Sequence, residues 1–382
     1  GFSLKHKNNQ QDEIQAFAFE NYDFSDVQGT NLVAGSGSTG TLEGTDRADV
    51  IIGRTGIDTI LAGSGNDAVD GGAGNDIIYG GSGSDILHGD AGNDQIHIEG
   101  GAAGDVDYVN GGADVDTLLV HIAATYHFDV LGVANVFANL PAAALTATGP
   151  AFALTSDGAG AAYVQGVENL DAADAENTLK ILSFAQINGT GLKFLDFTAG
   201  DTDTAEFTGS AITSFVLKGE LGQSIVSDGG ANSAKIAGVD KWYLTGNKDT
   251  VTIHQSHVGL QTVHIYGQGG NEDTAIFNGF SADLVFQDGQ EIGNTGVILH
   301  GIETIVGGSG NNTFYGTSGR DVFYGGTGVT TVYGSLGNDF VSTQGALVLD
   351  YSASASAVFF TRNGPLYQGG GTANSMSYGD QF

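Results

Sequence analysis

The chain has 382 residues and is strongly acidic, with 44 Asp and Glu against 12 Lys and Arg and a formal net charge of -32. This charge disfavours nucleic acid and anionic lipid as partners and favours divalent cations. Because 40% of the residues are apolar, the sequence predicts a folded chain rather than an acidic disordered one. Cysteine is absent and no apolar run is long enough to cross a bilayer, so we expect no disulfides and no membrane insertion by this segment.

Residues 1–43 precede the first regular repeat. The stretch from 12 to 29, DEIQAFAFENYDFSDVQG, is similar to the last coil of a preceding repeat. GSGSTG at 35–40 fits the phosphate-loop pattern GxGxxG, but no strand and helix flank it, so phosphate binding is not favoured. We predict that residues 1–43 form an N-terminal cap or the end of an upstream coil, and that the chain is a segment of a longer protein.

A nine-residue repeat occupies residues 44–120. It is clearest at 71–97, where GGAGNDIIY, GGSGSDILH and GDAGNDQIH follow one another. Glycine prevails at the second and fourth places, aspartate fills the sixth and an aliphatic residue the eighth. Two looser copies, one with an inserted residue, complete the block. The aspartates of the sixth place are Asp49, Asp58, Asp67, Asp76, Asp85, Asp94, Asp107 and Asp116.

The period predicts two columns of aspartates. Two nine-residue half-coils make one coil of 18 residues, so Asp67 lies one coil from Asp49, and Asp76 one coil from Asp58. Glycine permits positive φ and the close approach of stacked turns. We expect the aliphatic residue of the eighth place to point inward from a short strand, and the aspartate of the sixth place to point outward at the end of the turn.

Stacked aspartates predict a bound cation. Neighbouring parallel strands lie about 4.8 Å apart, where two carboxylates at an effective dielectric of about 20 repel by about 3 kcal/mol. Calcium takes about six to eight oxygen ligands, which carboxylates and glycine carbonyls can supply. Several Ca2+ ions are therefore the predicted cofactors, and the array is expected to be expanded without them. Arg47 and Asp114 replace the fourth-place glycine near the two ends of the block, which weakens the edge sites. The predicted ligands here are the eight aspartates and the turn glycines Gly63, Gly65, Gly72, Gly74, Gly81, Gly83 and Gly92.

Residues 121–306 lose the nonapeptide but keep a weaker rhythm. GVENL at 166, GVDKW at 238 and GIETI at 301 each precede an Asn-Thr or Asp-Thr pair, and alternating apolar segments recur roughly every 20 to 27 residues. This pattern predicts irregular β-helix coils, with a β-sandwich inserted between two rolls as the alternative. The alanine-rich stretch 134–163 is predicted to form a short helix or a surface loop.

A few side chains of the middle region are candidates for other chemistry. His254, His257 and His264 lie close in sequence, and strand alternation lets His254 and His264 share a face, although scattered surface histidines are favoured over a transition-metal site. Trp242 can stack on a sugar, but we expect it to fill the coil interior. The basic residues that make 218–248 the best place for acidic-sugar chemistry are Lys218, Lys235, Lys241 and Lys248.

A second nonapeptide block runs from 307 to 342. Its sixth places read Asn312, Asp321, Thr330 and Asp339, so alternate units lack aspartate. Because alternate units share a column, Asp321 and Asp339 are predicted to bind calcium, whereas the column of Asn312 and Thr330 is predicted to have lost much of it. Residues 343–382 are predicted to begin a further, truncated coil.

The repeat resembles the glycine-rich nonapeptide GGxGxDxUx of the RTX (repeat-in-toxin) family. The resemblance implies calcium in the turns and export through a type I secretion channel as an unfolded chain that folds outside the cell. It also implies the fold class that we predict: all-β, a right-handed parallel β-roll or β-helix solenoid, with two calcium-binding blocks flanking irregular coils.

Catalytic motifs are absent from the sequence. It has no HExxH, no GxSxG and no cysteine nucleophile, so we expect a non-catalytic segment with no catalytic residues. The favoured function is an extracellular calcium-binding structural or adhesive module of a bacterial surface layer, adhesin or matrix, with self-association or a cell-surface polysaccharide as its partner. The alternatives are the secretion and folding region of an RTX enzyme or toxin, and a carbohydrate-binding or polysaccharide-modifying β-helix centred on 180–300.

Overall fold

The structure is a computed structural model, and it describes residues 31–34, 39–99, 105–121, 125–131, 151–156, 161–172, 177–181, 187, 191–198, 202–208, 214–220, 222–227, 234–269, 272–334 and 339–350. Regular structure in these ranges is almost entirely β-strand. The chain divides into two compact units, and each is described by itself. The first unit contains Gly1–Ile122 and Asp129–Leu170, and the second contains Ala123–Phe128 and Asp171–Phe382.

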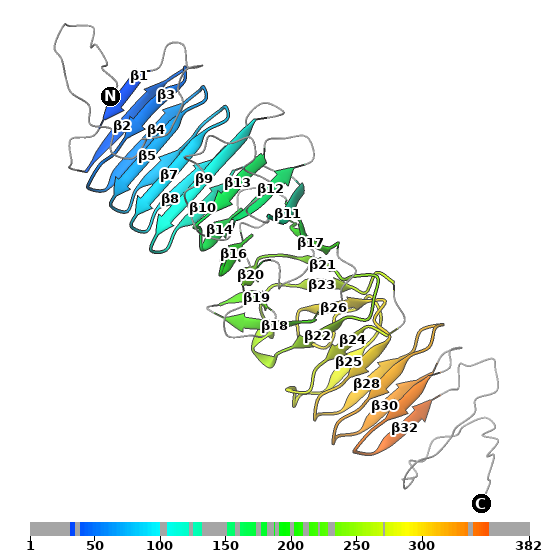
Figure 1. Cartoon of the computed structure of the whole chain (residues 1–382). Coiled ribbons are helices and arrows are strands. Elements are labelled where there is room, and N and C mark those ends of the chain that lie inside the picture. The colour runs from blue at the N-terminus through cyan, green and yellow to red at the C-terminus, as the bar shows by residue number, and fades with distance from the viewer. Residues whose placement is uncertain are drawn as a thin grey trace, which may run out of the picture. The chain divides into compact units, whose positions relative to one another are not determined.

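The first unit is built from two sheets that the chain visits in turn (Figure 1). One sheet contains, in spatial order, β1 (Asn31–Ala34), β3 (Asp49–Ile52), β5 (Ala68–Ala73), β7 (Ile86–Ala91), β9 (Val106–Ala113), β13 (Ala161–Gln165) and β12 (Ala151–Ser156). The other contains β2 (Gly40–Thr45), β4 (Asp58–Gly63), β6 (Ile77–Tyr79), β8 (Gln95–Ile98), β10 (Thr117–Val120) and β14 (Asn169–Asp171).

Strand pairing in the repeat block is parallel and follows the predicted coil. Val50 pairs with Ala68, which pairs with Ile86. Between the sheets lies a core of eighth-place aliphatic side chains with no exposed surface, as predicted: Ile51, Ile60, Val69, Ile78, Leu87 and Ile96. The period therefore produces a two-sheet roll whose interior is apolar.

The orientation predicted for the sixth-place aspartates is wrong. Asp85 and Asp116 are completely buried, and of the eight aspartates none is more than 8% exposed. The sixth and eighth places are two residues apart, and side chains in a strand alternate between its faces. The backbone that turns the aliphatic residue inward therefore also turns the aspartate inward.

The second unit continues the same plan with less regular coils. One sheet contains β11 (Thr125–Leu131), β15 (Thr178–Ile181), β17 (Thr204–Phe207), β21 (Lys241–Tyr243), β23 (Val263–Tyr266) and β26 (Val297–His300). A second contains β16 (Phe194–Asp196), β20 (Lys235–Ala237), β19 (Gln223–Ser227), β18 (Ser214–Glu220), β22 (Thr250–Ile253), β24 (Thr274–Ile276), β27 (Thr304–Val306), β29 (Val322–Tyr324) and β31 (Phe340–Ser342). A third contains β25 (Leu284–Phe286), β28 (Asn312–Tyr315), β30 (Thr330–Tyr333) and β32 (Leu347–Asp350).

Most pairs in the second unit are parallel, as β15 with β17 and β22 with β24. Among the strand pairs described in this unit, β19 pairs antiparallel with both β18 and β20. This pairing supports the β-helix interpretation of the middle region over an inserted β-sandwich. A 3₁₀ turn, η2 (Gln255–His257), follows β22.

Two sequence predictions fall partly or wholly on residues outside the described ranges. In the stretch 134–163, the described parts are β12 and the start of β13, which pair antiparallel, so these parts are strands and not the predicted helix or loop. The predicted N-terminal cap and the C-terminal coil lie outside the described residues over 1–30, 35–38 and 351–382.

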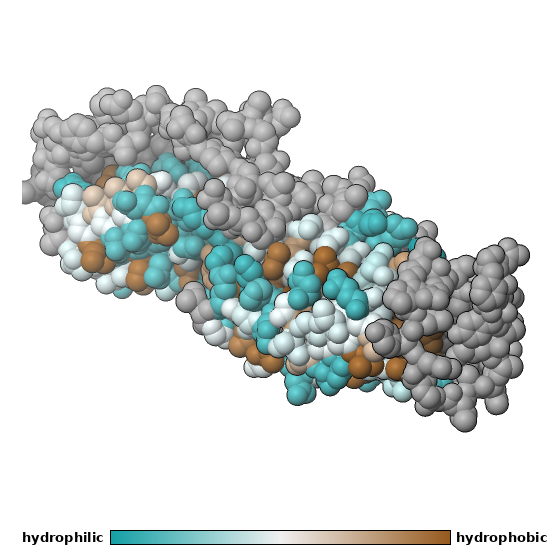
Figure 2. All heavy atoms as spheres, turned by 90° about the horizontal axis from the view of Figure 1, so that it is seen from below, coloured by the Kyte–Doolittle hydropathy of each residue, from teal (hydrophilic) through white to brown (hydrophobic). Residues whose placement is uncertain are grey.

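On the face seen in Figure 2, polar and apolar residues are intermixed. Exposed apolar residues include Ile57 and Val115 in the first unit. Among the described residues, no helix has the length and hydropathy needed to cross a membrane.

Candidate metal centre

The first ladder of aspartates lies on the sheet of β3, β5, β7 and β9. The backbone amide of Asp49 donates to Asp67 Oδ1 at 2.7 Å, that of Asp67 to Asp85 Oδ1 at 2.8 Å, and that of Asp85 to Asp107 Oδ1 at 3.0 Å. Each carboxylate is therefore held by the amide of the aspartate one coil earlier. This arrangement confirms the predicted column.

The second ladder lies on the sheet of β4, β6, β8 and β10. The amide of Asp58 donates to Asp76 Oδ1 at 2.8 Å, that of Asp76 to Asp94 Oδ1 at 2.7 Å, and that of Asp94 to Asp116 Oδ1 at 2.9 Å. The amide of Asp116 then donates to Glu168 Oε2 at 2.9 Å. Glu168 was missed by the repeat count, and its signal is the GVENL motif that replaces the next nonapeptide.

In most ladder aspartates, the second carboxylate oxygen, Oδ2, accepts no hydrogen bond. It is buried and has no hydrogen-bond partner in six aspartates: Asp58, Asp67, Asp76, Asp85, Asp94 and Asp116. A buried anionic oxygen without a partner costs several kcal/mol in a low-dielectric interior, so a compensating positive charge is expected beside it.

Glycine leaves the space that these oxygens face. A Cβ on Gly71 would lie 2.8 Å from Asp76 Oδ2 and 3.0 Å from the carbonyl oxygen of Gly89, which belongs to the next coil. A Cβ on Gly80 would lie 2.8 Å from Asp85 Oδ2. Carboxylate and carbonyl oxygens therefore converge on the bare face of a first-place glycine, a position that the sequence prediction did not include.

The glycines predicted as ligands, at the second and fourth places, have a different visible role. All seven adopt positive φ, between 87° at Gly81 and 151° at Gly74. A Cβ on Gly72 would collide with the backbone of Arg54 one coil earlier. They are required by the tight stacking of the turns, and a contribution of their carbonyl oxygens to a cation stays a prediction.

Burial raises the pKa of the ladder carboxyls well above the usual value of 3.8. The pKa rises to about 6 for Asp67 and Asp76, to about 7 for Asp107 and Asp116, and to about 8 for Asp85. Loss of hydration is the largest cause, the amide hydrogen bonds oppose it, and neighbouring carboxylates add to it. Without a cation, Asp85 would be largely protonated at neutral pH, and Asp107 and Asp116 would be partly protonated.

The second block has one acidic column and one neutral column, as predicted. The amide of Asp321 donates to Asp339 Oδ1 at 3.2 Å. In the neutral column, Asn312 Nδ2 donates to the carbonyl oxygens of Gly308 and Gly310, both at 2.9 Å. The amide group of Asn312 thus satisfies turn carbonyls within the protein, which supports the predicted loss of calcium there.

Two aspartates at the starts of acidic columns differ from the rest. Asp49 Oδ2 accepts hydrogen bonds from the amide and hydroxyl of Thr45 at 2.6 and 2.9 Å. Asp321 Oδ2 accepts from the amide of Thr317 at 2.7 Å and from its hydroxyl at 3.2 Å. A threonine four residues before the aspartate therefore supplies donors to the oxygen that is bare elsewhere.

The donor set fits a hard cation bound largely by backbone. Within the described ranges, no three histidine or acidic side chains come together in a metal-binding group. Carboxylate and carbonyl oxygens are the ligands that calcium prefers. The buried Oδ2 atoms, such as those of Asp76 and Asp85, would hold Ca2+ together with turn carbonyls, and the ion would supply the positive charge that these sites lack.

His254 and His264, the two histidines that strand alternation could bring to one face, do not lie together. His254 is exposed at the start of η2 and His264 is in β23 on another sheet, so the two do not share a face, in line with the favoured prediction of scattered histidines. His257 departs from that prediction, because it is buried and not on the surface. His264 Nδ1 instead lies 3.0 Å from His300 Nε2. Trp242 has no exposed surface, as predicted for a residue of the coil interior.

Comparison with protein families identifies the repeats. The family model of the RTX calcium-binding nonapeptide repeat matches residues 43–78, 63–96, 70–105, 79–118 and 301–332. The matched ranges contain the eight aspartates of the two ladders and most of the second block. No curated protein matches the chain.

Proposed function

This chain carries RTX calcium-binding nonapeptide repeats, and from that premise we propose that it is an extracellular structural or adhesive module whose folding and stiffness depend on Ca2+. The observation that carries the proposal is the set of buried Oδ2 atoms without hydrogen-bond partners. A chain of net charge -32 with such sites is destabilised by its own carboxylates until cations neutralise them.

The extracellular location follows from the same dependence. RTX repeat proteins are typically secreted, and calcium sites of extracellular modules are commonly weak, with dissociation constants of about 10⁻⁴–10⁻³ M. The fold of such a chain is weakly stable where calcium is scarce and strongly stabilised where it is plentiful. The secretion and folding region of an RTX enzyme or toxin shares this property and is the alternative to a surface-layer, adhesin or matrix component.

Calcium titration of the chain followed by far-UV circular dichroism tests the proposed dependence. We expect a weaker β-signal and a lower melting temperature in metal-free protein at pH 7.5, and a cooperative gain in both on adding CaCl2, with NaCl at equal ionic strength as the control. A β-signal of equal size with and without calcium would overturn the proposal. Ordered assemblies or calcium-dependent attachment to cells would then separate the structural and adhesive role from the folding role.

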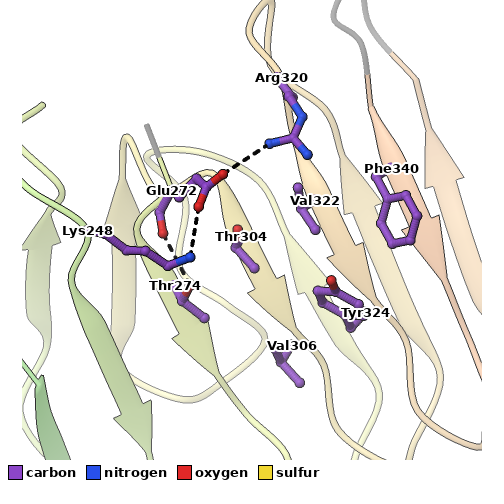
Figure 3. A pocket seen from close by; sticks show the side chains of 9 residues that line it. All are labelled: Lys248, Glu272, Thr274, Thr304, Val306, Arg320, Val322, Tyr324 and Phe340. Carbon is purple, nitrogen blue, oxygen red and sulfur yellow. Dashed lines mark hydrogen bonds and ion pairs between the residues drawn. The ribbon is translucent and has the colours of Figure 1, made fainter. Parts of the chain in front are cut away.

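A groove in the second unit favours glycan binding as a second candidate function. It has a volume of about 390 Å³ and lies on β24, β27, β29 and β31 (Figure 3). Tyr324 and Phe340 are 41% and 48% exposed on its floor. Glu272 Oε2 contacts Lys248 Nζ at 2.8 Å, and Glu272 Oε1 lies 3.8 Å from Arg320 Nη1. Exposed aromatic rings beside two cations suit an acidic sugar, whose carboxylate pairs with a guanidinium.

The groove is placed differently from the sequence expectation. It involves residues from 248 to 340, rather than a site centred on 180–300, and Lys248 is the one lysine of the four predicted candidates that lines it. Calorimetric titration with an acidic oligosaccharide, such as oligogalacturonate, tests this candidate. Tyr324→Ala should abolish binding, and Tyr315→Ala, at a similarly exposed tyrosine on another sheet, should not. No heat of binding with the unaltered chain would reject it.

A further inference from the structure

We propose that the second unit holds a divalent-cation site whose carboxylate, that of Asp273, lies outside the matched repeats and which also includes the backbone carbonyl of Gly301 beside Gly267. The ion is a hard cation of the Ca2+ class, because the groups offered are carboxylate and carbonyl oxygens. The family matches end at residue 118 and resume at 301, so the nonapeptide pattern does not assign Asp273.

Asp273 belongs to a third ladder, which the loss of the nine-residue period hides in the sequence. The amide of Asp249 donates to Asp273 Oδ1 at 2.8 Å, and the amide of Asp273 donates to Glu303 Oε2 at 3.0 Å. These residues precede β22, β24 and β27, which are neighbours in one sheet. The backbone thus aligns three carboxylates on successive irregular coils.

The second oxygen of Asp273 has no partner. Asp273 has no exposed surface, and its Oδ2 atom accepts no hydrogen bond. A Cβ on Gly267 would lie 2.6 Å from this oxygen and would also collide with the carbonyl oxygen of Gly301 on the next coil. Two oxygens therefore converge on the bare face of a glycine, with no protein donor to separate them.

An equivalent arrangement occurs around Asp116, at the end of the first block of matched repeats. A Cβ on Gly111 would lie 2.6 Å from Asp116 Oδ2 and would collide with the carbonyl oxygen of Gly166. The amide of Asp116 donates to Glu168 Oε2, and its own Oδ2 lacks a partner. This set consists of a glycine, an aspartate, and the glycine and glutamate of the next coil.

The same four residue types recur around Asp273 in the same order. Gly267 takes the place of the first glycine, and Gly301 and Glu303 take the places of the glycine and glutamate in the next coil. Gly301 has φ of 63°, compared with 60° for Gly166, so both carbonyls are directed by the same left-handed backbone. A site that belongs to the repeats in the first unit is thus rebuilt in the second unit without the repeat spacing.

Asp249, the preceding member of the third ladder, provides the contrast. It is also completely buried. Its Oδ2 atom accepts hydrogen bonds from the amide of Thr245 at 2.9 Å and from the Thr245 hydroxyl at 2.8 Å. Protein donors therefore satisfy this oxygen, and a cation is not required there. The two aspartates differ in the one feature on which the proposal depends.

The test counts calcium ions bound per chain by equilibrium dialysis with ⁴⁵Ca, for the unaltered chain, Asp273→Asn and the matched control Asp249→Asn. We expect Asp273→Asn to bind one ion fewer than the unaltered chain and Asp249→Asn to bind the same number. An unchanged count in Asp273→Asn, or an equal decrease in both variants, would overturn the inference. It rests on the proposed calcium function, and an unaltered chain that binds no calcium would instead reject that function.

Melting temperatures of the same variants separate a lost ligand from a damaged fold. In calcium, Asp273→Asn should melt below the unaltered chain. In metal-free buffer it should melt at the same temperature or higher, because the change removes an unpaired buried charge. Asp249→Asn should lower the melting temperature under both conditions, since the Thr245 hydrogen bonds weaken in each. A decrease of the same size for Asp273→Asn with and without calcium would assign Asp273 a structural role only.

Discussion

The ladder aspartates differ in whether their second carboxylate oxygen, Oδ2, accepts hydrogen bonds from the protein. Where a threonine stands four residues earlier, as Thr45 does for Asp49, the oxygen accepts two hydrogen bonds from protein. Where a glycine stands there, as Gly72 does for Asp76, the oxygen is buried without a partner. The pattern TxxxD therefore marks carboxylates that the protein satisfies by itself, whereas the bare carboxylates have glycine at that place or, before Asp58 and Asp94, Arg54 and Asp90.

Exchange of a bare carboxylate for an amide should cost stability only when calcium is present. We expect Asp76→Asn to lower the free energy of unfolding in calcium by about 1–3 kcal/mol, the scale of a lost interaction with a buried polar group, and to have little effect in metal-free buffer. Asp49→Asn should lower the free energy of unfolding by the same amount with and without calcium, because Thr45 supplies hydrogen-bond donors to Asp49 under both conditions. Urea unfolding measures each value, and equal losses for Asp76→Asn with and without calcium would contradict this distinction.

The raised carboxyl pKa values predict that acid stabilises the metal-free chain. Asp67, Asp85 and Asp116 have folded-state pKa values of about 6, 8 and 7, above the value of 3.8 for an unfolded aspartate. The folded state binds more protons, so their contribution is fully present below about pH 4 and is lost as the pH rises through 6 to 8.

We therefore expect metal-free protein, prepared on a chelating resin, to melt at a higher temperature at pH 5 than at pH 8. Saturating calcium should remove or reverse this difference, because the ionised carboxylates are then the favoured form. A metal-free chain that is more stable at pH 8 than at pH 5 would show that these carboxyls are not desolvated in the fold.

The turns hold a second determinant of the sites, since most of the bare carboxylates face a glycine at the first place of the repeat. Gly71→Ala would place a Cβ 2.8 Å from Asp76 Oδ2 and 3.0 Å from the carbonyl oxygen of Gly89. We expect it to destabilise the calcium-loaded chain by about 1–3 kcal/mol, as overpacking of a tight site does. At the exposed Gly246 the nearest atom to an added Cβ is 3.9 Å away, so Gly246→Ala should change the melting temperature little. Equal changes in melting temperature for Gly71→Ala and Gly246→Ala would show that Gly71 is not part of the metal site.

The regular elements were predictable, and the failures have physical causes. The 18-residue coil and the pairing of Asp49 with Asp67 follow directly from the nine-residue period. The aspartates point inward, and not outward as predicted, because the sixth and eighth places lie on the same face of the strand. Glu168 and Asp273 were not predicted as ladder residues, because insertions change the spacing in the sequence while the strands keep their register in the sheet. His300 lies 36 residues from His264, and no local pattern links them.

Across the whole molecule, charge and fold oppose each other. A net charge of -32 favours expansion, and the ladders place part of that charge in the interior. Cations bound at the bare carboxylates remove both penalties together, so calcium binding is expected to stabilise the folded state strongly. The neutral column of Asn312 and Thr330 needs no such compensation, since its turn carbonyls are bonded within the protein.

Hydrogen–deuterium exchange, measured by mass spectrometry with and without calcium at pH 7.5, tests this account most directly. The amides of Asp67, Asp76 and their neighbours in β4–β8 should be protected in calcium and should exchange rapidly after chelation. The strands β28 and β30, which carry the neutral column, should lose less protection. Equal protection of β4–β8 with and without calcium would contradict the claim that the buried carboxylates make the fold depend on the cation.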